Sequence, residues 1–202
     1  MANFGDYQIP HFEDDLPTIK EFLRIVLNTI FFHRWIGETN FEDCDSIFPN
    51  ITYVKIKNEN LQKTIESKIS LLEKSIIKTQ HAQVILNFYE KKVKKFFLYD
   101  EFSNLWESWK FLFIIKKEKK DSSDNDKDKD MEKEISIRNY LSFILQKLND
   151  KIDYMPNFSM DVKLPEETFP FEIIINTEMK ENDLISIIKD MNIKNALKDD
   201  FI

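Results

Sequence analysis

The sequence predicts one α+β domain with a mixed sheet and three principal helices. The stretch from Leu105 to Ile115 is rich in aromatic and β-branched residues and apolar on both faces, which is typical of a strand covered on both sides. Other long stretches repeat apolar residues at helical spacing. The 202 residues, of which 42% are hydrophobic, suffice for one domain with a sizeable core and are few for two.

The first sixteen residues are polar and acidic, and they predict a flexible, loosely held arm ahead of a domain over residues 17–202. The first helix is predicted to begin at Thr18, which forms a capping box with Glu21, and to end at Gly37, a typical residue just beyond a helix. Its apolar residues form one continuous stripe: Ile19, Phe22, Leu23, Val26, Leu27, Ile30 and Phe31.

The middle of the chain alternates strands and a helix. A polar turn at residues 43–45 precedes a short strand at Ile51–Ile56. The second helix is expected over about 60–79, because its apolar residues fall on one face and its charged residues on the other. A strand at Val84–Tyr89 then leads towards the central strand.

A charged, low-complexity tract over residues 119–131 predicts a disordered loop inside the domain. The third helix is expected over about 132–153, where apolar residues recur at helical spacing. A strand at Phe171–Ile175 and a fourth, weaker helix at about 183–197 complete the predicted elements.

Composition excludes several classes of protein. A formal charge of −7 argues against nucleic acid as the main partner, because phosphate binding requires positive surface. Two glycines cannot build a glycine-rich phosphate loop, and one cysteine excludes an internal disulfide framework. No apolar run approaches the roughly 20 residues of a transmembrane helix, so we expect a cytoplasmic protein.

Residues that could perform catalysis are sparse. Alternate acidic residues between Asp124 and Asp128 resemble a calcium loop, but Lys129 and Ile135 stand where that loop needs Gly and Glu. No two histidines have the i, i+4 spacing of a helical metal site; they are His11, His33 and His81. We therefore expect no enzyme, no metal site and no cofactor.

The most function-like stretch is Phe96-Phe97-Leu98-Tyr99, between a basic run and an acidic pair. One interpretation is a strand or turn packed on the core. The other is an exposed aromatic finger that inserts into a partner, since aromatic anchors contribute much of the binding energy at interfaces.

Five short stretches, in this order and at this approximate spacing, resemble the HORMA-domain family. They are Val26–Arg34 with Gly37 beyond it, Ile51–Ile56, Phe88–Lys92, Trp106–Trp109 and Tyr154–Pro156. The resemblance covers about residues 18–191. It implies a single HORMA domain, in which three helices back a central, mainly antiparallel sheet and a C-terminal segment resembles a safety belt.

The resemblance also implies a function. It is to the members of the family that serve as non-enzymatic adaptors of the kinase complex that initiates autophagy. Such an adaptor pairs with a second HORMA subunit, stabilises it and recruits downstream factors to autophagosome-formation sites through a Trp-Phe finger. In this chain the finger would fall at Phe96 to Tyr99, where Phe97 and Tyr99 stand and no Trp is present.

Pairing with a like domain agrees with surplus apolar residues on the first and third helices. A helix between a sheet and solvent needs one apolar face, but Ile25, Phe32, Tyr140 and Phe143 widen it. These four are either covered by loops of the same domain or form a dimer surface.

Two other functions remain open from the sequence. A spindle-checkpoint or chromosome-axis adaptor of the same fold would capture a peptide with residues 169–202. A peripheral membrane module would bring the lysines of 91–95 to anionic lipid and insert Phe96 and Phe97.

Overall fold

The computed structural model describes residues 4–36, 39–91, 102–116, 126–149 and 169–177. Its α-helices are α1 (Leu16–Arg34), α2 (Glu59–Thr79) and α3 (Asp126–Asn149). Its strands are β1 (Gly5–Gln8), β2 (Phe12–Asp14), β3 (Phe41–Asp45), β4 (Thr52–Ile56), β5 (His81–Lys91), β6 (Phe102–Ile115) and β7 (Phe171–Asn176). The predicted fourth helix at 183–197 lies outside the described residues.

The main sheet has the strand order β1-β6-β5-β7, and β2 extends the β1 side by pairing with β6. Strand β5 is antiparallel to both β6 and β7, whereas β1 and β2 are parallel to β6. The sheet is therefore mixed and mostly antiparallel. The predicted fold class, α+β with three helices on a sheet, is confirmed.

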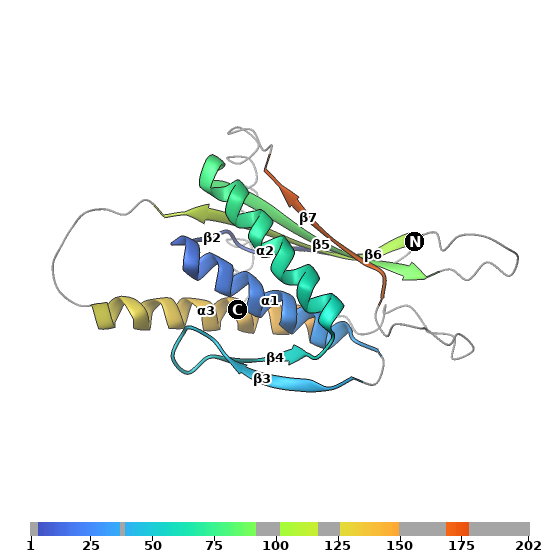
Figure 1. The fold of residues 1–202 in the computed structure, drawn as a ribbon, viewed down its shortest axis with the longest axis horizontal. Helices are drawn as coiled ribbons and strands as arrows, with labels where there is room; N and C mark the ends of the chain where they lie inside the picture. The colour runs from blue at the N-terminus through green and yellow to red at the C-terminus, as the bar shows by residue number, and fades with distance from the viewer. Residues whose placement is uncertain (1–3, 37–38, 92–101, 117–125, 150–168, 178–202) are drawn as a thin grey trace, which may run out of the picture.

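The core lies between the sheet and the three helices (Figure 1). Residues of β6 that alternate along the strand, Trp109, Phe111 and Phe113, point into it together with the apolar stripes of α1 and α2. Stacked and edge-to-face aromatic pairs contribute to this packing; an example is Phe22 of α1 against Phe113, at 6.3 Å between ring centroids. The predicted central strand is thus the centre of the structure.

Helix α1 begins two residues earlier than predicted, with a different cap. The carboxylate of Asp15 accepts a hydrogen bond from the backbone N–H of Thr18 at 2.9 Å, so Asp15 is the N-cap. The predicted Thr18–Glu21 capping box is wrong, because the Glu21 carboxylate instead pairs with Arg24 on the next turn. The helix ends at Arg34, and Gly37 lies outside the described residues.

The expectation of a flexible arm over residues 1–16 is wrong for the described part of that segment. Strands β1 and β2 pair in parallel with β6, in the registers Tyr7 with Trp109 and Phe12 with Phe113. Tyr7, Ile9 and Phe12 are buried in the helix-side core. The N-terminal segment is therefore an integral edge of the sheet.

Helix α3 also differs from its prediction at the start. It begins at Asp126, so the second half of the predicted disordered loop at 119–131 is helical, while 117–125 lie outside the described residues. The Lys133 ammonium lies 2.6 Å from the Asp15 carboxylate and 3.1 Å from that of Asp14. These ion pairs join the first turns of α3 to the N-terminus of α1.

A two-stranded sheet of β3 and β4 stands apart from the main sheet and packs on α1. Strand β4 confirms the predicted strand at Ile51–Ile56 with a start one residue later. The predicted polar turn at residues 43–45 is wrong, because these residues form β3, with Asp43 opposite Val54. Its alternation of exposed and half-buried residues agrees with a strand that covers a helix on one face only.

Candidate partner-binding surfaces

The predicted aromatic finger, Phe96 to Tyr99, lies outside the described residues, but the strands that flank it are described. Strands β5 and β6 form a long antiparallel hairpin in which the last recorded pair is Lys91 with Phe102. Register shifts interrupt the pairing between Phe88 and Tyr89 and between Tyr89 and Lys91. Residues 92–101 are therefore the connection of this hairpin.

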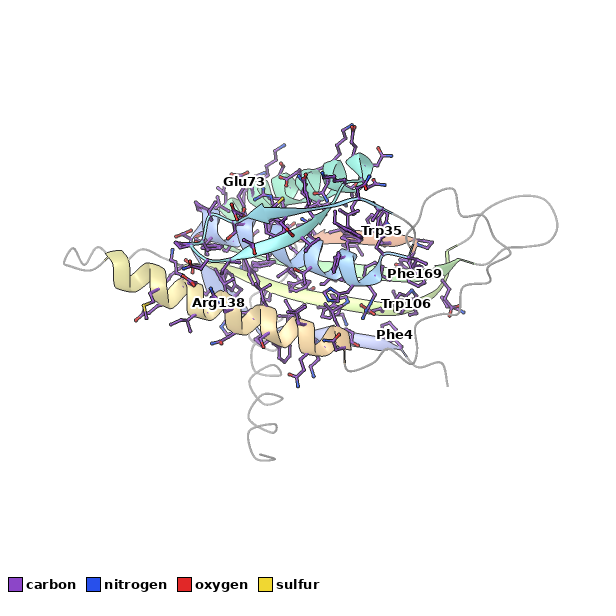
Figure 2. All side chains as sticks on the ribbon, turned by 90° about the horizontal axis from the view of Figure 1, so that it is seen from below. Phe4, Trp35, Glu73, Trp106, Arg138 and Phe169 are labelled. Atoms are coloured by element: carbon purple, nitrogen blue, oxygen red, sulfur yellow. The ribbon has the colours of Figure 1, made fainter. Side chains whose placement is uncertain are left out.

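At the end of the hairpin that residues 92–101 connect, aromatic rings from three separate segments pack together. The Trp106 ring of β6 lies 5.9 Å from the Phe88 ring of β5 and 4.7 Å from the ring of Phe169, which precedes β7. Figure 2 shows Trp106 and Phe169 close to Trp35 at one end of the molecule. This packing fixes the strands that carry residues 92–101.

A buried ion pair lies beside these rings. The Arg34 Nε atom, at the end of α1, donates to Glu107 Oε2 of β6 at 2.8 Å, and both side chains are almost completely buried. The Trp109 indole N–H also donates to the Glu107 carboxylate, and the Arg34 guanidinium lies 5.9 Å from the Trp106 ring centre. Burial raises the pKa of Glu107, whereas Arg34 and Trp109 act in the opposite direction.

The structure separates the four residues predicted as a possible dimer surface. Ile25 is fully buried inside the domain, so for this residue the covering within the same domain is the correct alternative. Phe32 is half-buried and lies 5.0 Å, edge to face, from the Phe41 ring of β3. Phe41 itself is exposed, so this pair lies at the surface of the β3–β4 sheet.

The other two residues lie on α3. The Tyr140 ring packs 5.3 Å from Phe12 and 5.5 Å from Phe22, and its hydroxyl donates to the backbone carbonyl of His11. Tyr140 is therefore mainly a contact between α3 and the N-terminal strand. Phe143 is half-buried, with the Lys147 ammonium 5.3 Å from its ring centre.

A row of exposed residues on α3, three of them apolar, was not predicted from the sequence. Met131, Ile135 and Leu145 are 63%, 48% and 37% exposed, and with the exposed Arg138 and Ser142 they recur every three or four residues. We call these five residues the α3 outer stripe. The opposite side of α3 supplies the core residues Ile137, Ile144 and Leu148. Figure 2 labels Arg138 on this helix.

The sequence signal for the α3 outer stripe was present but ambiguous. The helix has more apolar residues than one buried face requires, and the sequence alone does not define which of them face outwards.

In the described part of the chain no helix is long and apolar enough to span a membrane.

Comparison with known proteins identifies the family of this chain. The model of the family "Autophagy-related protein 101" matches residues 13–161, which is more than half of the chain. The chain is also similar to Autophagy-related protein 101 of Arabidopsis thaliana, with 28% identity over 187 residues that cover 83% of this chain and 85% of the plant protein. The chain therefore belongs to the autophagy-related protein 101 family, whose members are HORMA-domain proteins with an accessory role in autophagy.

Proposed function

We propose that this protein is a non-enzymatic scaffold of the autophagy-initiation kinase complex. It pairs with a second HORMA-domain subunit, stabilises that subunit and recruits downstream autophagy factors. Its place of action is the cytoplasm, at sites of autophagosome formation. Membership of the autophagy-related protein 101 family supports the autophagy role.

The α3 outer stripe is the observation that carries the pairing. Exposed apolar side chains at i, i+4 spacing cost free energy in water and gain it when a partner covers them. Met131 and Ile135 have this spacing, and Leu145 lies on the same side of the helix beyond Arg138 and Ser142; the other side is anchored in the core. A helix with a buried apolar side and three exposed apolar residues on its outer side fits between its own sheet and a second protein.

Two charged substitutions test this surface. Ile135→Asp combined with Leu145→Asp places two carboxylates in the α3 outer stripe, and we expect it to abolish co-purification of the second HORMA subunit from cells. The matched control is Ser136→Asp with Gln146→Asp, which adds the same charge at exposed positions turned by about 100° around the helix. The control is expected to retain the partner. Equal retention by both variants would exclude the α3 outer stripe as the pairing surface.

Recruitment is assigned to Phe97 and Tyr99. The hairpin of β5 and β6, braced by the rings of Phe88, Trp106 and Phe169, supports the segment that carries them. Replacing both with Ala is expected to weaken binding of downstream factors by about 2 kcal/mol while the thermal unfolding temperature stays unchanged. A lower unfolding temperature with unchanged binding would instead identify them as core residues.

A further inference from the structure

The main sheet has a second apolar surface, on the face turned away from the three helices. Neighbouring residues of a strand point to opposite faces, so Leu112 and Ile114 of β6 point away from the side of Trp109, Phe111 and Phe113. Ile85 of β5 and Ile174 of β7 share the face of Leu112. None of these four belongs to the core between the helices and the sheet. We call Ile85, Leu112, Ile114 and Ile174 the far-face stripe.

Strand pairing places the far-face stripe on a diagonal. Ile85 is directly opposite Ile174, whereas the partner of Leu112 on β5 is Gln83, two residues before Ile85. The stripe therefore begins at β7, crosses β5 and continues along β6 to Ile114. Polar residues flank it on both sides, Gln83 and Asn176 on one and Asn87 and Lys110 on the other. Its outline is therefore long and narrow, as a single helix would cover.

Part of this face is buried. Leu112 is 0% exposed, and Ser108 and Asn87 on the same face are 2% and 8% exposed. The three described helices all lie on the other face (Figure 1). The buried Oδ1 atom of Asn87 has no hydrogen-bond partner among the described residues. A covering layer on this face would account for the burial and offer a donor.

We propose that residues 183–197 form an amphipathic helix that folds back over the far-face stripe. Leu184, Ile187, Ile188 and Met191 recur at i, i+3, i+4 and i+7, which places them on one side of a helix. Ser186 and Lys189 fall on the other side. The far-face stripe gives this apolar side a surface to cover.

Chain length permits this return. Strand β7 is an edge of the main sheet and ends at Asn176, so the segment starts beside the stripe. Residues 178–182 can span about 17 Å when extended, whereas β6 lies only about 10 Å from β7 across the sheet. A helix over residues 183–197 would be about 22 Å long, which is sufficient to cross three strands diagonally. The proposal does not depend on the autophagy role.

Disulfide trapping tests the contact directly, because Cys44 is the single cysteine of the chain. In a Cys44→Ser background, Ile85→Cys is combined in turn with Leu184→Cys, Ile188→Cys or Met191→Cys. The control combines it with Lys189→Cys, on the other side of the helix. A disulfide needs Cβ atoms roughly 4 Å apart, so at least one of the three test pairs is expected to close about ten-fold faster than the control.

Two results of the trapping would overturn the proposal. Equal closure rates for the test pairs and the control would mean that no defined face of residues 183–197 contacts the sheet. Disulfides between molecules, without closure inside one molecule, would mean that a second copy of the chain covers the stripe. Both are read from non-reducing gels of the full-length chain.

Thiol labelling gives an independent readout. In the same background with Ile85→Cys alone, adding Ile188→Asp and Met191→Asp is expected to raise the rate of alkylation at residue 85 about ten-fold, because the cover is released. The control Ser186→Asp with Lys189→Asp is expected to leave the rate unchanged. An unchanged rate in the first variant, with the fold retained by circular dichroism, would overturn the proposal.

Discussion

The Arg34–Glu107 pair is the residue-scale feature with the largest expected effect on stability. Removing one member of a buried ion pair leaves the other charge buried without compensation, which typically costs about 3–5 kcal/mol. We expect Glu107→Ala to lower the free energy of unfolding by this amount in urea titrations. Glu59→Ala, which removes the exposed pair with Lys63, is the control and is expected to cost less than about 0.5 kcal/mol. Similar losses in both variants would contradict the buried role of Glu107.

A second ion pair gives a pH-dependent prediction. The Arg24 guanidinium donates to both carboxylate oxygens of Glu66, at 2.6 and 2.9 Å, and these hydrogen bonds hold the pKa of Glu66 below its usual value of 4.5. A depressed pKa contributes stability above about pH 4.5 that is lost as the pH falls through the folded-state pKa. The stability difference between the natural chain and Glu66→Gln should therefore be largest near neutral pH and shrink below pH 4.5. A difference independent of pH would show that the pair does not stabilise the fold.

At the scale of elements, the N-terminal strands provide the sharpest test. Phe12 of β2 is 4% exposed and stacks on Phe22 of α1 at 4.2 Å, whereas Phe4, just before β1, is 42% exposed. Phe12→Ala is expected to cost about 3–5 kcal/mol of unfolding free energy, and Phe4→Ala less than about 0.5 kcal/mol. If both variants were equally stable, the N-terminal segment would be the loose arm expected from the sequence.

The elements that the sequence predicted best are those whose apolar pattern extends over many residues. Helices α1 and α2 carry apolar stripes of several turns, and β6 is apolar on both faces, so each is defined by its own residues. Strands β1 and β2 have four and three residues, too few to show a period, and they are strands because they pair with β6. The acidic residues of β3 and of the first turn of α3 resemble loops in composition.

At the scale of the whole molecule, the support of the β5–β6 hairpin depends on contacts between distant parts of the chain. Arg34 and Glu107 are 73 residues apart in the sequence, and no local pattern joins them. The sequence showed that the helices have more apolar residues than one buried face requires. It did not show which of them are buried and which are exposed, since Ile25 is buried while Ile135 is exposed. The order of short motifs was more informative, because it identified the family before any contact was known.

We propose that this chain is a subunit that pairs with a second HORMA domain. The decisive measurement is native purification of the unmodified chain from its own cells, followed by mass spectrometry of the proteins retained in stoichiometric amount. We expect to recover a second HORMA-domain subunit together with the autophagy-initiation kinase. A spindle or chromosome-axis protein in their place, or recovery of the chain alone, would contradict it.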